Sequence, residues 1–309
     1  MTPSAIAIDL GGTAIKYGVV TQKGEILWEQ IVPTPDGPAE SIIGQLIRCV
    51  EEAKHVGHPT CVGIGTPGLV DIQSGTVLGG APQLPDWKGL PLATLIEKET
   101  GLPVFVDNDA NLMGLGEFTF GTKNKGENVI FVTIGTGIGG AIILNGDLYR
   151  GHYFAGSELG CIPYSFDGKF GYWEDFASTG AMVNRYQALS GETGDQINGK
   201  YIFQKAREGN ATALQVIHEN TTMIGHGIGG LINIFNPERV IIGGGISEAG
   251  KEYVDEIKKV AVSFALDDCA NHVQVCAASL GNKAGFLGAG YFALSQLQRM
   301  QNKPLTSQP

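Results

Sequence analysis

The hydrophobic pattern of the first half of the chain predicts strands that alternate with helices. Apolar runs bounded by turn residues are typical of strands, whereas apolar residues spaced three and four apart are typical of one helix face. Strands are therefore expected near 4–9, 15–20, 26–32, 61–65 and 104–106, and helices over 38–55, over 92–100 and, after the polar cluster 107–111, to about 120. Residues 71–90 are rich in glycine and proline, which predicts a loop.

The second half repeats this plan. Strands are expected near 128–134, 139–144, 147–150, 239–242 and 273–276, and helices between about 174 and 235, over 249–264 and over 284–299. Residues 151–173 are expected to be irregular, and the polar last ten residues to be disordered. Strands that alternate with helices, with a hairpin opening each half, indicate mixed α/β sheets. The break between the halves is expected near 121–126.

In each half, an apolar strand runs into a glycine-rich corner and a second apolar strand follows at once. The corners are Gly11-Gly12-Thr13 and Gly135-Thr136-Gly137-Ile138-Gly139-Gly140. A corner with so few side chains is typical of a backbone that must lie directly against another group. The N–H groups of a tight turn form a concavity that binds anions. The pair of corners predicts a duplicated architecture that holds one phosphate ligand from both sides. The second corner looks superficially dinucleotide-binding, but a strand rather than a helix follows it, and no GxxxxGK[ST] loop is present.

Composition and charge narrow the classes of function. At 309 residues, the chain is long enough for two domains with separate cores. A net charge of −10 argues against a nucleic-acid binder, although it permits phosphate ligands held by backbone amides or a divalent metal. The 5 cysteines include no CxxC pair, so a disulfide framework or zinc cluster is not expected and a reducing compartment fits. Since there is no signal peptide and no apolar stretch of membrane-spanning length, we expect a cytoplasmic protein without membrane partners.

Asp109 is the strongest candidate for a catalytic residue. It follows a strand and opens a helix, and side chains at the carboxyl edge of strands line clefts. A carboxylate there can accept the proton of a hydroxyl whose oxygen attacks phosphorus, and Asn108 can hold that hydroxyl. Capping of the helix by Asp109 explains the same residue about equally well.

Asp9 is the second acidic candidate, because it interrupts an apolar strand just before the first corner. A carboxylate at this position can hold a hydrated Mg²⁺ next to phosphates. The alternative is a buried turn-former bonded to the amides of Gly11 and Gly12. Lys16, on the returning strand, faces either phosphate or solvent and is kept as a candidate ligand of the nucleotide.

Glu158 and Glu174 are candidate sugar ligands, because a carboxylate accepts two hydroxyl protons. Their alternative is an exposed loop charge. Gly244, in a run of three glycines after an apolar strand, permits the close approach of a base or a ribose, and a structural turn explains it nearly as well.

Together, these segments resemble the ROK family, which contains bacterial sugar kinases and related repressors of the actin/hexokinase ATPase superfamily. The matching segments are IDLGGTAIKYGVV, FVDNDANLMGLGEFTFG, TIGTGIGGAIILNGDLYRG, NIFNPERVIIGGGIS and SLGNKAGFLGAG, which span residue 4 to about 296. The resemblance implies an α/β fold of two ribonuclease-H-like domains with an interdomain cleft over ATP-Mg and a hexose. The smaller N-terminal domain would cover 1–121, completed by the helix 285–299, and the larger domain 122–284.

The resemblance also implies roles for individual residues. Asp109 is implied as the base that activates the sugar hydroxyl. The residues implied on the sugar side are Gly68, Asn108, Glu158 and Glu174. The residues implied on the nucleotide side are Asp9, Gly11, Gly12, Thr13, Thr136, Gly137 and Gly244.

Two departures from the family pattern bear on the substrate. The family commonly has a histidine where Cys161 stands and then a CxCGxxGC zinc cluster, whereas 165–172 contains no cysteine or histidine. Zinc needs such ligands, so no structural zinc is expected. Aromatic packing is expected to support Glu174 instead, from Phe166, Phe170, Tyr172 and Trp173. Gln83 stands where many relatives have asparagine, so Gln83 and Cys161 are both candidate residues of the sugar pocket.

The implied function is ATP-dependent phosphorylation of a hexose, with glucose at its 6-hydroxyl as the first expectation. Mannose, an N-acetylhexosamine, fructose or a β-glucoside remain open as acceptors, and polyphosphate as donor, because the corners do not identify what lies beyond the γ-phosphate. A DNA-binding repressor is not expected, since only Met1–Ser4 precede the first strand. A protein that binds sugar without catalytic activity is a further alternative, and the presence of both Asp9 and Asp109 argues against it. A homodimer is implied by the family alone.

Overall fold

The computed structural model of the chain describes residues 2–81, 84, 86–121, 126–245 and 250–302. The chain divides into two compact units. Unit 1 consists of Met1–Lys123, Arg150–Gly156 and Asn282–Pro309, and unit 2 consists of Asn124–Tyr149 and Ser157–Gly281. The segment Arg150–Gly156 therefore groups with unit 1, although its neighbours on both sides along the chain belong to unit 2.

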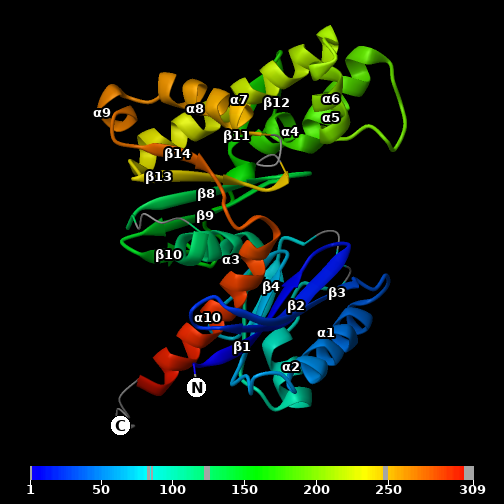
Figure 1. The fold of residues 1–309 in the computed structure, drawn as a ribbon, viewed down its shortest axis with the longest axis vertical. Helices are drawn as coiled ribbons and strands as arrows, with labels where there is room; N and C mark the ends of the chain where they lie inside the picture. The colour runs from blue at the N-terminus through cyan, green and yellow to red at the C-terminus, as the bar shows by residue number, and fades with distance from the viewer. Residues whose placement is uncertain (1, 82–83, 85, 122–125, 246–249, 303–309) are drawn as a thin grey trace. The chain divides into compact units, whose positions relative to one another are not determined.

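Unit 1 is built on a five-stranded mixed sheet (Figure 1). The strands are β1 (Ser4–Leu10), β2 (Ala14–Thr21), β3 (Ile26–Pro33), β4 (Val62–Thr66) and β7 (Val104–Asn108), in the order β3-β2-β1-β4-β7. The first three strands are antiparallel neighbours, whereas β4 runs parallel to β1 and β7 parallel to β4. The carboxyl ends of β1, β4 and β7 consequently meet at one edge of the sheet.

The two faces of this sheet are covered in different ways. Ile6, Ile8 and Leu10 of β1 share a core with α1 (Ala39–Ala53) and α2 (Leu92–Thr100). The smaller Ala5 and Ala7 face α10 (Ala284–Asn302), which packs closely on β1 and β4 (Figure 1). Because side chains alternate along a strand, Asp9 lies on the α10 face. That face also holds α3 (Asp109–Gly116), which continues as the π-helical turn η1 (Glu117–Gly121) and packs against α10.

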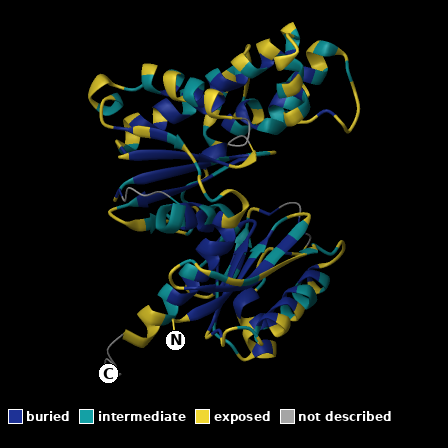
Figure 2. Cartoon of the chain, in the orientation of Figure 1, coloured by how far each residue is buried: buried dark blue, intermediate teal, exposed yellow. Residues whose placement is uncertain are grey.

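Unit 2 repeats the strand order of unit 1. Its sheet runs β10-β9-β8-β13-β14, and the strands are β8 (Val129–Ile134), β9 (Ile138–Leu144), β10 (Asp147–Tyr149), β13 (Arg239–Gly243) and β14 (Gln274–Ala277). β8, β9 and β10 form an antiparallel meander, and β13 and β14 extend it in parallel. The duplicated mixed α/β plan expected from the sequence is therefore confirmed, and the inner strands of both sheets are mostly buried (Figure 2).

The remaining elements of unit 2 are mostly helical. They are η2 (Leu159–Cys161), α4 (Trp173–Ala177), α5 (Thr179–Ser190), α6 (Gly199–Arg207), α7 (Ala211–Phe235), α8 (Lys251–Ser263) and α9 (Asp267–Ala270); the short η4 (Gly281–Lys283) precedes α10. The core joins Ile130, Val132 and Ile242 of the sheet to Ile228 of α7 and Ile257 of α8. Among the described helices, none is long and apolar enough to cross a bilayer.

Two stretches expected to lack regular structure contain short strands. The expected loop 71–90 includes part of a hairpin of β5 (Leu69–Asp71) and β6 (Thr76–Gly79), and the expected irregular stretch 151–173 includes a hairpin of β11 (Pro163–Phe166) and β12 (Lys169–Tyr172). Strands of three or four residues are too short to show the alternation on which sequence prediction depends. These segments are strands because each one pairs with its neighbour in the hairpin, and their own hydrophobic pattern does not identify them.

Candidate active site

Asp9 and Asp109 lie at the same edge of the unit 1 sheet. Asp9 is in register with Gly65 of β4, and Gly65 is in register with Asp107 of β7. Asp109 follows β7 and begins α3. An ideal Cβ built on Gly65 would lie 3.8 Å from Oδ1 of Asp9 and 3.6 Å from Cα of Asp109. The two candidate acids are thus neighbours, separated by a residue without a side chain.

Burial raises the pKa of both carboxyl groups. Desolvation and then repulsion by Asp109 raise the pKa of Asp9 from 3.8 to about 7, while Lys16 lowers it. Desolvation also raises the pKa of Asp109, although hydrogen bonds with backbone, including that from the Ala110 N–H at 2.8 Å, oppose the shift. Neighbouring acids with raised pKa values are typical of functional sites, because a proton, cation or substrate must offset their charge.

Asn108 is the residue that caps α3. Its Oδ1 accepts from the N–H of Asn111 at 3.1 Å, and its Nδ2 donates to the carbonyl of Gly68 at 3.0 Å. The structure therefore brings together Gly68 and Asn108, two predicted sugar ligands, and assigns the capping role to Asn108 rather than Asp109. The carboxylate of Asp109 accepts from the N–H of the next residue and is left to other chemistry.

The first glycine corner connects β1 to β2. The Gly11 N–H donates to the carbonyl of Ala14 at 3.0 Å. Thr34 braces the corner, because its hydroxyl donates to the Gly11 carbonyl at 2.7 Å and its N–H to the Thr13 carbonyl at 3.0 Å. Sequence reasoning missed Thr34, which lies just after β3 and carries no local motif.

Lys16 leaves the first corner on β2 and is already engaged. Its Nζ lies 2.9 Å from the carboxylate of Glu29 on β3 and 5.2 Å from the centre of the Phe286 ring. The side chain is only 15% exposed, so its expected alternative of facing solvent is not what the structure shows. Its charge still acts on the site, because it lowers the pKa of Asp9.

The second corner connects β8 to β9 in unit 2. The Gly135 N–H donates to the carbonyl of Gly137 at 2.9 Å, and the Thr179 N–H at the start of α5 donates to the carbonyl of Gly135 at 2.8 Å. Gly244 has φ +80°, and a Cβ there would collide with the backbone of Ile134. Three predicted nucleotide ligands, Thr136, Gly137 and Gly244, therefore belong to one backbone cluster at this corner.

Glu174, in the first turn of α4, lies against the second corner. Its Oε2 accepts from the Ile138 N–H at 3.1 Å and would lie 2.7 Å from a Cβ on Gly137. The Cys161 thiol has its pKa raised first by desolvation and then by Glu158, Glu174 and a third acid, Asp175. The three predicted sugar-side residues of unit 2 are thus close enough to interact electrostatically. Such a group can bind hydroxyls, with the carboxylates accepting and the thiol donating.

The β11–β12 hairpin occupies the stretch in which the sequence predicts no zinc cluster and expects aromatic packing around Glu174 instead. Trp173 is fully buried and its Nε1 donates to the carbonyl of Met223 at 2.9 Å, while Phe166 packs on the same core. The prediction was wrong for Phe170 and Tyr172, which are 89% and 53% exposed. Their alternation along the two-stranded hairpin turns them outward, so Trp173 and Phe166 alone among the four expected aromatics support α4.

Gln83 lies outside the described residues. Within the described chain, no three His, Cys, Asp or Glu side chains gather as a metal site.

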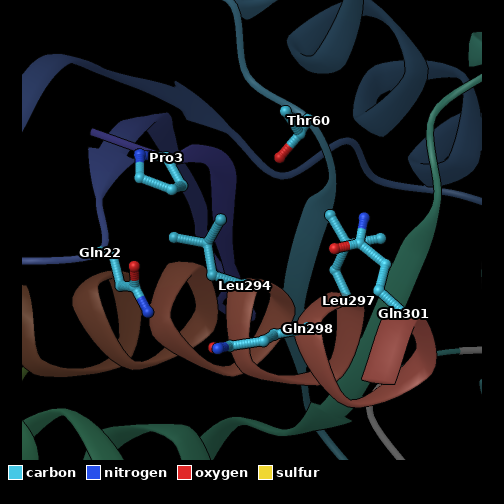
Figure 3. A pocket seen from close by; sticks show the side chains of 7 residues that line it. All are labelled: Pro3, Gln22, Thr60, Leu294, Leu297, Gln298 and Gln301. Atoms are coloured by element: carbon cyan, nitrogen blue, oxygen red, sulfur yellow. The ribbon is translucent and has the colours of Figure 1, made fainter. Parts of the chain in front are cut away.

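A pocket of about 350 Å³ opens beside Pro3, Thr60 and Leu294 at the amino ends of β1 and β4 (Figure 3). It lies at the opposite end of these strands from Asp9 and Asp109, so it is not the candidate active site.

Comparison with known proteins places the chain in a family. The ROK family profile matches residues 5–296, and the protein belongs to the ROK family. A glucokinase of Streptomyces coelicolor is 40% identical over 93% of this chain and 96% of its own, and a β-glucoside kinase of Listeria monocytogenes is 34% identical over 95% and 98%. A crystal structure of a ROK family glucokinase from Streptomyces griseus, in complex with glucose and AMPPNP, superposes with a TM-score of 0.81 at 36% identity, covering 94% of this chain and 99% of that chain.

Proposed function

We propose that this chain is an ATP-dependent sugar kinase that transfers the γ-phosphoryl group to the 6-hydroxyl of glucose. The observation that carries the proposal is the half-buried Asp109, with a raised pKa, beside Asn108 at the carboxyl edge of the unit 1 sheet. The relatives named above support glucose as the acceptor and ATP as the donor, since one is a glucokinase and another was solved with glucose and an ATP analogue.

In the proposed reaction, Asp109 takes the proton of the sugar hydroxyl while the hydroxyl oxygen attacks the γ-phosphorus. The bond between that phosphorus and the β–γ bridging oxygen breaks, and its electron pair leaves on ADP. A carboxyl group with a raised pKa holds the proton better than an ordinary one, which favours its transfer from an alcohol. Asn108, fixed as the cap of α3, would orient the same hydroxyl.

Magnesium fits the residues of unit 1. Two half-buried carboxyl groups, Asp9 and Asp109, are neighbours, and the opposing cation Lys16 is shared with Glu29. A divalent cation would offset the remaining negative charge, and Asp9 would hold it through water. When bound, Mg²⁺ supplies charge neutralisation to the phosphates.

The remaining assignments belong to the same proposal. On the sugar side they are Gly68, Gln83, Asn108, Glu158, Cys161 and Glu174, and on the nucleotide side Asp9, Gly11, Gly12, Thr13, Lys16, Thr136, Gly137 and Gly244. The proposal includes two domains, a smaller one completed by α10 and a larger one. We also propose a cytoplasmic homodimer that works in glycolysis.

The test is a panel of sugars with ATP and, in parallel, with polyphosphate. Purified protein is incubated with Mg²⁺ and glucose, mannose, N-acetylglucosamine, N-acetylmannosamine, fructose or cellobiose, and phosphorylated sugar is measured directly. We expect kcat/KM to be highest for glucose with ATP. A higher value for cellobiose, the acceptor class of the β-glucoside kinase relative, would replace glucose in the proposal. No phosphorylated product from any sugar with either donor would overturn it.

A further inference from the structure

Arg150 forms an ion pair with the buried Asp107 of β7, which directly precedes Asn108 and Asp109 along the chain. Its Nε and Nη2 both donate to Oδ2 of Asp107, at 2.9 and 2.5 Å. Asp107 is 1% exposed and Arg150 is 15% exposed. The guanidinium carbon also lies 5.4 Å from the centre of the Phe292 ring on α10. A charge pair this deeply buried is costly to form unless its geometry is well satisfied.

The other carboxylate oxygen of Asp107 holds the start of α3. Oδ1 accepts from the N–H of Asn108 at 2.8 Å and from Nδ2 of Asn111 at 3.2 Å. One oxygen thus binds Arg150, while the other binds the backbone that immediately precedes Asp109. The carboxylate connects the guanidinium to the two residues proposed for catalysis.

Two hydrogen bonds join the two ends of the segment that carries Arg150. The Gly156 N–H donates to the Arg150 carbonyl at 2.9 Å, and the Ser157 hydroxyl donates to the Tyr149 carbonyl at 3.2 Å. A Cβ on Gly156 would lie 2.7 Å from the Arg150 carbonyl carbon, so only glycine fits there. The chain therefore leaves β10, inserts Arg150 into unit 1 and returns two residues before Glu158.

We propose that Arg150 is a positioning residue, which holds Asn108 and Asp109 in register for phosphoryl transfer by fixing Asp107. This inference rests on the proposed function. Arg150 acts through Asp107 and does not itself take part in the chemistry. Loss of its contacts lets the start of α3 shift, and a displacement on the order of 1 Å at a reacting group costs about 100-fold in rate.

The test compares Arg150→Lys and Arg150→Met with matched changes at Arg185. Arg185 also pairs with a carboxylate, Glu219 at 3.0 Å, and lies over an aromatic ring, Phe166 at 6.0 Å, but it belongs to unit 2. We expect kcat to fall about 10-fold in Arg150→Lys and about 100-fold in Arg150→Met, while KM for ATP changes less than about threefold. Arg185→Lys and Arg185→Met should keep kcat within about twofold.

A second measurement separates positioning from a loss of stability. Hydrogen exchange of the peptide that contains Asn108 and Asn111 should accelerate in Arg150→Lys at a temperature where the variant is fully folded, because the Asp107 hydrogen bonds loosen. Gly156→Ala should show the same acceleration and a smaller loss of kcat, with Arg150 still present. Since Arg150→Met removes one partner of a buried pair, the lysine and Gly156→Ala variants decide the question if that variant fails to fold.

The outcomes distinguish this inference from the proposed function. A wild-type protein that phosphorylates none of the sugars overturns the function itself. A wild-type enzyme that is active, together with Arg150→Lys and Gly156→Ala variants that retain kcat and the wild-type exchange of this peptide, overturns the positioning role alone. A fall in kcat that is matched by the Arg185 variants at equal loss of melting temperature would also reject it.

Discussion

The two units share one strand order, but they differ at the carboxyl ends of their parallel strands. Unit 1 carries Asp9 and Asp107 there, whereas the described counterpart strand ends of unit 2 carry no carboxylate. In unit 1, Asp9 pairs in register with Gly65. At the equivalent position of unit 2, Thr133 pairs with Gly243. Likewise, the fifth strand of unit 1 is followed by Asp109, whereas the fifth strand of unit 2 is followed by Ala278.

The glycine corners belong to the topology that both units share, whereas the carboxylates with raised pKa values lie in unit 1. A glycine corner between the first two strands is present in both units, so a backbone suited to phosphate comes with the topology. Carboxylates with raised pKa values are present at this edge in unit 1 alone among the described residues of the two sheets. We therefore expect proton transfer to depend on unit 1, whereas the corner of either unit offers a backbone suited to phosphate.

The largest expected effect comes from removing the carboxylate that has no counterpart in unit 2. Asp109→Asn keeps the size of the side chain but cannot take a proton. We expect kcat to fall by about 10²–10⁴-fold, while the dissociation constant for glucose changes little. Steady-state kinetics and calorimetric titration with glucose measure the two quantities.

The control for Asp109→Asn is Asp255→Asn, which removes an exposed carboxylate paired with Lys251 on α8. This variant should keep its kcat, because surface ion pairs contribute little. Turnover of Asp109→Asn within about tenfold of wild type would show that the asymmetry between the units does not mark the catalytic base.

The next effect tests whether both corners contact phosphate. An ideal Cβ on Gly12 or on Gly135 meets no other atom within 4 Å, so alanine should not disturb the folded protein at either position. A methyl group at a corner that cradles phosphate would nonetheless separate the two. We expect Gly12→Ala and Gly135→Ala each to raise KM for ATP about tenfold, with melting temperatures near that of wild type.

The matched control for the corner variants is Gly230→Ala on α7, where a Cβ also meets nothing within 4 Å. It should leave KM for ATP unchanged. If one corner variant raises KM for ATP and the other behaves like Gly230→Ala, then the phosphates contact a single copy and the duplication has no shared role in binding.

A smaller effect concerns Cys161, which is exposed in unit 2 and interacts with Glu158 and Glu174. Cys161→His adds a stronger hydrogen-bonding group among these acids, whereas Cys161→Ser keeps the size of the thiol. We expect the histidine variant to change the KM for glucose by about three- to tenfold, and the serine variant by less. Equal KM values for all three proteins, across the sugar panel, would remove Cys161 from the sugar pocket.

Much of this site could be predicted from sequence, because its parts are local. The corners appear as glycine runs between apolar strands, and Asp109 stands at a strand-to-helix junction. The placement of Asp9 beside Asp109 could not be predicted from the sequence, since the sheet order that joins β1, β4 and β7 is a tertiary property.

The contacts that hold the site in place could not be predicted. Arg150 and Asp107 are separated by 43 residues, and an arginine after a short strand has no pattern that identifies its partner. Thr34 braces the first corner from 23 residues away. The exposure of Phe170 likewise depends on which face of a four-residue strand is covered, and apolar character alone does not decide this.

The smallest expected effect is a change in the pH dependence of stability at a contact within unit 2. The Tyr164 hydroxyl lies 2.9 Å from Nδ1 of His226, so the β11–β12 hairpin is joined to α7. Desolvation lowers the pKa of His226 below its usual 6.5. Below the unfolded pKa, the unfolded chain therefore binds a proton more readily than the folded one, and stability falls as the pH falls through about 6.5.

His226→Gln keeps a hydrogen-bonding group without titrating, so its melting temperature should decline less between pH 7.5 and 5.5 than that of wild type, by about 1 °C. His272→Gln, at an exposed histidine, should decline as wild type does, and an equal decline in the His226 variant would show that the hairpin contact does not respond to protons.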